Sequence, residues 1–171
     1  MKKLIVILSL ILLASCTPKE VDFDLLNKRQ GVWYEVSSQR PFTGVSKDFH
    51  KNGQFRLNAY LKDGKVSGLQ KIFYENGQLS SKDNFKDGLN HGLHESYHKN
   101  GNLESKGNYK KGETDGLHES YHKNGNLEYK TNYKEGENHG LAEYYYEDGR
   151  LEIKGCYQNG ELIPDLSVCE K

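Results

Sequence analysis

Apolar residues recur every 24 positions between residues 44 and 163. Each of five consecutive segments has four apolar positions, and polar residues alternate with them. The four columns are Val45, Leu69, Leu93, Leu117 and Leu141; Phe49, Phe73, Tyr97, Tyr121 and Tyr145; Phe55, Leu79, Leu103, Leu127 and Leu151; and Leu61, Phe85, Tyr109, Tyr133 and Tyr157. Alternation of this kind is typical of β-strands with one buried face. The fixed period indicates tandem repeats in which each unit stacks on its neighbours.

Glycines with the same period separate the apolar segments and predict the turns. The glycine columns are Gly44, Gly68, Gly92, Gly116 and Gly140; Gly53, Gly77, Gly101, Gly125 and Gly149; and Gly64, Gly88, Gly112, Gly136 and Gly160. In four of the five repeats the second column follows an asparagine, and Asn-Gly pairs are strong hairpin signals. The repeats therefore predict an all-β fold, an elongated and twisted antiparallel β-meander of about eleven strands built from five 24-residue hairpins.

The apolar columns also predict the register of the hairpins. Loops of three residues, Lys99-Asn100-Gly101 and Lys110-Lys111-Gly112, would place all four columns on one face. The predicted pairs are Tyr97 with Leu103 and Tyr109 with Glu113. A slip of one residue would divide the apolar stripe between the two faces. The opposite face is expected to be polar and to carry His94, His98, Glu104, Lys106 and their equivalents.

A single-layer sheet leaves its apolar face in contact with water unless something covers it. Strong twist, terminal caps and a partner molecule are three ways to cover it. Tyrosine offers a large rigid ring with a polar tip, which interface centres favour. We therefore hypothesise a binding groove, covered by a partner protein or by a second copy of the chain, and formed by Tyr97, Tyr109, Tyr121 and Tyr133. The alternative is that these tyrosines are the core of the fold.

Residues 1–15 have the pattern of a secretory signal peptide. Lys2 and Lys3 precede an apolar run from Leu4 to Leu13. The run is shorter than the roughly 20 residues of a membrane-spanning helix. We therefore expect export of the chain.

The end of this segment, Leu13-Ala14-Ser15-Cys16, resembles the bacterial lipobox. The resemblance implies cleavage before Cys16 and lipid attachment to that residue, which would anchor the protein to a membrane of the bacterial cell envelope. In a Gram-negative bacterium, Thr17 after the cysteine resembles a signal for the outer membrane. Ordinary cleavage after Ser15, with an incidental cysteine, is the alternative.

The remaining parts of the chain are expected to connect or cap the repeats. Residues 16–26 read as the lipidated N-terminus and a tether, residues 27–43 as a degenerate half-repeat that caps the array, and residues 164–171 as a C-terminal tail. Cys156 and Cys169 are the other two cysteines, and oxidising compartments favour their pairing. A disulfide between them would hold the tail across the last hairpin, with Cys156 expected on the polar face.

The junction from Tyr133 to Gly149, with its Gly136-Glu-Asn-His-Gly140-Leu core, resembles a MORN repeat. It is most similar to the bacterial variant, and Pro41-Phe42-Thr43-Gly44 resembles the start of such arrays. The resemblance implies a twisted antiparallel sheet that serves as a binding or scaffolding surface. Some bacterial members are classed as antitoxins or immunity-like proteins.

Composition and motifs favour binding over catalysis. Twenty-four basic and twenty-four acidic residues give a formal net charge of zero, so nucleic acid is not an expected partner. His94 and His98, like His118 and His122, are four residues apart, which on a strand is about 13 Å and too far to share a metal ion. Glu104, Glu128 and Glu152 recur on the polar face without a neighbouring pocket. We expect no enzyme activity, no cofactor and no metal.

These observations lead to one function hypothesis and two alternatives. The first is a lipid-anchored envelope protein whose repeats bind another protein as a scaffold. The second is an immunity or antitoxin protein that neutralises one specific toxin. The third is a module that binds glycan or cell wall.

Overall fold

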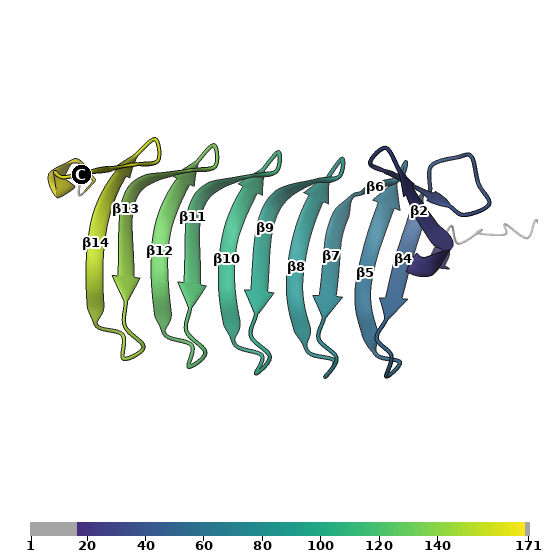
Figure 1. Cartoon of the computed structure of the whole chain (residues 1–171), viewed down its shortest axis with the longest axis horizontal. Helices are drawn as coiled ribbons and strands as arrows, with labels where there is room; N and C mark the ends of the chain where they lie inside the picture. Colours follow the sequence, from purple (N-terminus) through teal and green to yellow (C-terminus); the bar gives the residue numbers. More distant parts are fainter. Residues whose placement is uncertain (1–16, 170–171) are drawn as a thin grey trace, which may run out of the picture.

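The computed structural model describes residues 17–169 and shows one long sheet with a small second sheet near one end (Figure 1). The strands of the long sheet are β1 (Glu20–Asp22), β4 (Gly44–Phe49), β5 (Phe55–Lys62), β6 (Lys65–Val66), β7 (Gly68–Phe73), β8 (Leu79–Lys86), β9 (Leu89–Tyr97), β10 (Leu103–Lys110), β11 (Glu113–Tyr121), β12 (Leu127–Lys134), β13 (Glu137–Tyr145), β14 (Leu151–Gln158) and β15 (Glu161–Ile163). The second sheet contains β2 (Leu26–Arg29) and β3 (Val32–Glu35), and the 3₁₀ helices are η1 (Phe23–Leu25) and η2 (Leu166–Val168).

The long sheet is the predicted meander of antiparallel hairpins. Its strand order follows the chain from β4 to β15, and only β6 lies off this path, where it pairs with β5. The hairpins stand side by side along the long axis of the molecule (Figure 1). The eleven strands predicted from the repeats are β4, β5 and β7 to β15, while β1 and β6 are additional. The all-β fold class is therefore confirmed.

The turn after β9 has the predicted three-residue loop. The backbone nitrogen of His98 donates a hydrogen bond to the carbonyl oxygen of Asn102 (2.8 Å), and Gly101 donates to the carbonyl oxygen of His98 (2.8 Å). Tyr97 pairs with Leu103, as expected. Gly101 has a φ of 90°, which a residue with a Cβ rarely adopts, so the turn requires glycine there.

The turn after β10 differs from the prediction. Lys110 pairs with Glu113 and Tyr109 with Thr114, so the loop contains only Lys111 and Gly112. Both loop residues have positive φ, 54° for the lysine and 93° for the glycine. Two left-handed residues in succession form a type I′ turn, whose twist matches that of the flanking strands. The predicted pairing of Tyr109 with Glu113 is therefore wrong.

A β-bulge near the start of β10 changes which side chains share a face. Leu103 pairs with Tyr97, but Ser105 pairs with Ser96, so Glu104 is an extra residue on its strand. A bulge of this kind reverses the alternation beyond it. The same shift recurs in every repeat, and its extra residues are Arg56, Ser80, Glu104, Glu128 and Glu152.

The bulge corrects the prediction of a single apolar face. Three of the four apolar columns lie on one side of the sheet, here named the leucine face, with Leu93, Tyr97 and Leu103 as members. The fourth column pairs with glycine and faces the other side, as Tyr109 does opposite Gly92. This side is named the histidine face because His94 pairs with Gly107 there. Apolar side chains are therefore divided between two mixed faces.

The N-terminal hairpin β2–β3 caps the first repeat. Leu26 and Phe42 form a small buried cluster with Ala59 and Leu61 of β5. Trp33 packs against the cluster, and its backbone nitrogen donates to the carbonyl oxygen of Gly64 (2.8 Å). This end contains the largest group of buried apolar side chains among the described residues.

The prediction that residues 16–26 are only a tether is wrong for most of the segment. Glu20–Asp22 forms β1, which runs parallel to β4, and the backbone nitrogen of Val45 donates to the carbonyl oxygen of Lys19 (2.7 Å). The physical reason is that β4 would otherwise expose an unpaired edge. The ordered fold therefore begins no later than Lys19.

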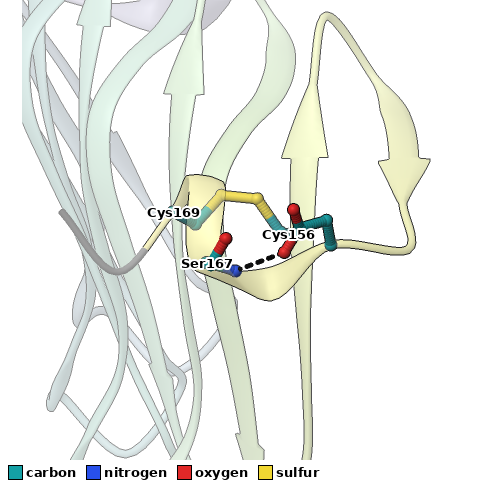
Figure 2. Close-up of a disulfide and its surroundings, with 4 residues drawn as sticks. Cys156, Ser167 and Cys169 are labelled. Carbon is teal, nitrogen blue, oxygen red and sulfur yellow. Dashed lines mark hydrogen bonds between the residues drawn. A yellow bond between two sulfur atoms is a disulfide. The ribbon is translucent and has the colours of Figure 1, made fainter.

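A disulfide closes the other end of the sheet. Cys156 on β14 is bonded to Cys169, with 5.8 Å between the Cα atoms, and η2 packs against β14 (Figure 2). The side chain of Asp165 accepts a hydrogen bond from the backbone nitrogen of Ser167 (3.0 Å) at the start of η2. Cys156 is fully buried and pairs with Leu141, so it lies on the leucine face, not on the polar face that was expected.

Candidate functional site

A lysine, a glutamate and a tyrosine form a repeated unit on the leucine face. In the second and third repeats, Lys82 Nζ lies 3.0 Å from Glu95 Oε2 and 3.1 Å from the Tyr97 hydroxyl, which itself donates to Glu95 (3.1 Å). The next copies join Lys106 to Glu119 and Lys130 to Glu143, each at 2.6 Å. The alternating charges on neighbouring strands are therefore satisfied within the sheet.

The hydrogen bonds of this unit stabilise the charged forms of its members. Bonds to Tyr97 and Glu95 raise the pKa of Lys82, and the bond from Lys82 lowers the pKa of Glu95. The bond to Glu143 likewise raises the pKa of Lys130. The unit is thus a ladder of ion pairs across neighbouring strands.

Exposed apolar side chains flank the ladder on both sides. Leu69, Leu93 and Leu117 are 44%, 42% and 44% exposed and recur two strands apart, about 9.6 Å. On the other side, the rings of Phe49 and Phe55 stack with centroids 4.8 Å apart, and each residue is 43% exposed. Contiguous apolar side chains are rarely so exposed on the surface of a soluble protein. The row of leucines therefore marks a candidate contact surface.

The structure does not bring the four predicted groove tyrosines together. Tyr97 and Tyr121 lie on the leucine face, whereas Tyr109 and Tyr133 lie on the histidine face. A single groove lined by all four is therefore excluded. The cause is the bulge at the start of β10 and β12, which sequence alternation does not reveal.

Each tyrosine of the fourth column lies opposite a glycine. Tyr109 pairs with Gly92 and Tyr133 with Gly116, and both glycines have φ near 90° or above. A ring next to a glycine covers backbone that no side chain protects, which is a recognised way to stabilise a glycine in a sheet. This pairing supports the alternative that the tyrosines of this column belong to the packing of the fold.

Two histidines lie at the centre of the histidine face. His94 Nδ1 is 2.5 Å from Oδ1 of the buried Asp83, whose Oδ2 accepts a hydrogen bond from Ser81 (2.8 Å). Burial alone would raise the pKa of Asp83, but the bonds from His94 and Ser81 hold it below its usual value. His118 lies against Tyr133 and Tyr129, with ring centroids 5.8 Å and 5.9 Å away.

The histidines four residues apart have separate structural tasks. His98 and His122 bind neighbouring repeats, because their Nε2 atoms lie 2.8 Å and 2.9 Å from the carbonyl oxygens of Tyr121 and Tyr145. Among residues 17–169, no group of three or more histidine, cysteine, aspartate or glutamate side chains has the arrangement of a metal site.

The recurring glutamates take up the bulge position. Glu104 Oε1 is 3.6 Å from His98 Nδ1, and Glu128 accepts a hydrogen bond from Ser120 (2.7 Å). Glu104 and Glu128 therefore each contact their own hairpin, and the three glutamates lie on three different hairpins.

A depression that was not predicted from the sequence lies at the Asn-Gly end of the first repeats. It has a volume of about 500 Å³, and its walls include Arg56, Ile72, Tyr74, Ser80 and Lys99. The available signal was the departure of Arg56, Ile72 and Ser80 from the repeat pattern, since the equivalent positions elsewhere hold other residue types.

No helix within the described residues has both the length and the apolar character needed to cross a membrane. The predicted lipid anchor, Cys16, lies outside those residues.

Comparison with known families supports the repeat assignment. Four segments match the family described as MORN repeat variant, and together they make up half of the chain. They are residues 67–87, 90–111, 114–135 and 138–159, so the first hairpin, β4–β5, lies outside the match although it has the same fold. No curated protein matches the chain. MORN repeats are generally associated with binding to proteins or membranes. The chain belongs to the MORN repeat variant family.

Proposed function

We propose that this chain is a lipid-anchored bacterial envelope protein whose repeats bind another protein through the leucine face. The observation that carries the proposal is the row of exposed leucines, Leu69, Leu93 and Leu117, beside an ion-pair ladder that is satisfied internally. Because the charges are already paired, a partner gains contact energy mainly from apolar area, about 25 cal/mol per Å² buried. The proposed role is binding, with no catalytic step.

Both ends of the sheet are short or covered, so a partner is expected to bind a face of the sheet. β1 and the β2–β3 hairpin occupy the N-terminal end, while the short β15 and the disulfide-linked η2 occupy the other. Exposed sheet edges are the usual sites of strand addition, and short or covered edges resist it. A scaffold role therefore depends on side chains of the leucine face and not on backbone pairing.

Two features support the envelope location. The segment before Cys16 resembles a lipobox, and the Cys156–Cys169 disulfide suits an oxidising compartment. Because the fold begins by Lys19, few residues separate it from Cys16, and each residue spans at most about 3.6 Å. A lipid on Cys16 would thus hold the N-terminal cap close to the membrane surface.

The anchor is tested by Cys16→Ser. We expect the variant to lose lipid labelling and to leave the membrane fraction, or to remain uncleaved. Mature-sized Cys16→Ser protein that stays in the membrane fraction would contradict the anchor and would leave the binding proposal open to its own test.

The binding surface is tested with a photo-crosslinking residue placed at Leu93 or Leu117 in the anchored protein. Ile153 is a matched control, because it is apolar and 62% exposed but pairs with Tyr144 on the histidine face. We expect one discrete protein adduct from the two leucine positions, lost on competition with the purified soluble domain, and none from Ile153. Equal labelling from both faces, or no adduct, would refute the proposed surface.

The adduct also separates the two alternatives from the scaffold role. A toxin in the adduct, with relief of its toxicity by this chain, would identify an immunity protein. Retention of the soluble domain on isolated peptidoglycan, with no protein adduct, would identify a cell-wall-binding module.

A further inference from the structure

The depression at the Asn-Gly end of the first repeats has the form of a binding pocket. Its volume of about 500 Å³ lies within the range of small-ligand sites. Ile72 and Tyr74 contribute apolar surface, while Arg56 from β5 and Lys99 from the β9–β10 turn contribute positive charge. Three successive repeats therefore build one cavity.

The pocket arises where the repeats break their own pattern. Arg56 occupies the bulge position that holds glutamate in the last three repeats, and Ser80 is the small residue at that position in the second. Ile72 stands where the third and fourth repeats have Ser96 and Ser120. The basic Arg56, the small Ser80 and the apolar Ile72 thus come together where the first and second repeats meet, and this combination does not recur in the later repeats.

The equivalent position in the third repeat is occupied by other contacts. There His98 stands in place of Tyr74, and Glu104 in place of Arg56 and Ser80. The two side chains approach each other to 3.6 Å. A carboxylate in place of the guanidinium would also repel an anion, so the same ligand would not bind there.

Hydrogen bonds fix the wall of the pocket before any ligand arrives. The Tyr74 hydroxyl donates to the carbonyl oxygen of Tyr97 (2.7 Å), and His50 Nε2 lies 2.8 Å from the carbonyl oxygen of Phe73. The first contact holds the Tyr74 ring in one orientation and the second holds the His50 ring, which reduces the entropy lost on binding.

The charged groups of the pocket favour an anion at one end. Lys99 Nζ lies over the Tyr74 ring, 6.0 Å from its centroid. Arg56 forms an ion pair with Asp48 through Nη2, which orients the guanidinium and leaves its other N–H groups available. Glu75 is the carboxylate among the lining residues, and it lies in the exposed β7–β8 turn.

We propose that this pocket binds a carboxylate joined to an apolar group. Arg56 and Lys99 contact the carboxylate, because a guanidinium and an ammonium form the stronger, charge-assisted hydrogen bonds with it. Ile72 and Tyr74 contact the apolar group. The C-terminal residue of a partner polypeptide and a free apolar acid share this chemistry. The proposal does not depend on the leucine face.

The test is an NMR titration of the folded chain with N-acetyl-phenylalanine and, separately, with its amide. We expect saturable shifts at Ile72 and Tyr74 with the acid, and about tenfold weaker binding of the amide, which lacks the charge. A short peptide that ends in phenylalanine distinguishes the two sources, since tighter binding of the peptide than of the acid indicates a chain terminus. Equal binding of acid and amide, or no shift at these residues, would overturn the proposal.

Variants taken from neighbouring repeats make the test specific. Arg56→Glu and Ile72→Ser introduce residues that already occupy the equivalent positions of folded repeats, and Lys99→Glu introduces the residue of the second and fifth repeats. Each should weaken the acid about tenfold. Lys99→Glu should leave the melting curve nearly unchanged, whereas Arg56→Glu should lower the melting temperature, because it replaces the ion pair with Asp48 by two like charges. Glu104→Arg changes the bulge position of the third repeat, outside the pocket, and as the matched control it should leave the shifts at Ile72 and Tyr74 unaltered. Unchanged affinity in Arg56→Glu together with Lys99→Glu would overturn the proposal.

Discussion

Gly107 lies directly opposite His118 in the sheet, and the His118 ring covers the place that a Cβ on Gly107 would occupy. At the equivalent pair of strands in the next repeat, β12 and β13, the larger residue lies on the first strand, because Thr131 pairs with Ala142. A large side chain on one strand is thus matched by a small residue on its neighbour, as close packing requires.

This relationship predicts a specific double-mutant result. Gly107→Ala should lower the free energy of unfolding by about 1–3 kcal/mol, because the His118 ring must move away from its packing against Tyr133. His118→Ala, which copies Ala142, should remove most of this cost when the two changes are combined. Urea denaturation of the two single variants and the double variant gives the coupling energy. A strictly additive result would show that the ring does not limit the Gly107 position.

The histidine-face tyrosines are predicted to stabilise the fold. Tyr133→Ala should lower the free energy of unfolding by about 2 kcal/mol, less than the loss for a fully buried ring, because Tyr133 is half-buried and lies opposite Gly116. Tyr133→Phe should have little effect, since Phe85 fills the equivalent position. Urea denaturation without any partner measures both. Unchanged stability in Tyr133→Ala would show that this ring does not contribute to the packing of the fold.

Burial of His118 predicts a dependence of stability on pH. Burial lowers the pKa of His118, the nearby His94 lowers it further, and Glu119 opposes the shift. The unfolded chain then binds the proton more tightly than the folded one. Stability should be complete above the ordinary histidine pKa of about 6.5 and should fall as the pH drops through the lower folded-state value.

The measurement is the denaturation midpoint between pH 7.5 and pH 5, where most carboxylates stay ionised. His118→Ala should make the curve flatter than that of the wild type. A slope that is identical in the two proteins would assign the pH dependence to other groups.

Sequence periodicity predicted the meander, its five hairpins and the Asn-Gly loops, because those features follow from residue types at fixed positions. It missed the bulge at Glu104, since an extra residue in a strand leaves the spacing between repeats unchanged. It also missed the type I′ turn, because Lys111 is an uncommon residue at positive φ. Both the missed bulge and the wrong loop length follow from the assumption that all four apolar columns lie on one face. In the folded sheet, Tyr109 opposite Gly92 covers the other face instead.

The candidate surfaces were harder to foresee for a related reason. The leucine row follows from the columns, but its exposure of more than 40% depends on how neighbouring strands pack. The pocket at Arg56 and Ile72 depends on side chains from three repeats, which sequence spacing alone does not bring together.

The disulfide is predicted to protect the C-terminal end of the sheet. Cys169→Ser should destabilise this cap by roughly 3 kcal/mol in the chain-entropy description of a short loop. Thiol labelling of denatured, unreduced Cys16→Ser protein, in which only Cys156 and Cys169 remain, should find no reactive thiol. Two labelled thiols in that protein would show that the bridge does not form.

The type I′ turns predict a substitution that stabilises the chain. Lys111 has a φ of 54°, a conformation that costs most residues about 1–2 kcal/mol and costs asparagine less. The equivalent turn of the fifth repeat contains Asn159, with a φ of 50°. Lys111→Asn should therefore raise the free energy of unfolding by about 0.5–1 kcal/mol, and Asn159→Lys should lower it by a similar amount. The two urea midpoints should move in opposite directions. A shift of the same sign in both variants would mean that side-chain contacts, and not the backbone preference at positive φ, determine the stability of these turns.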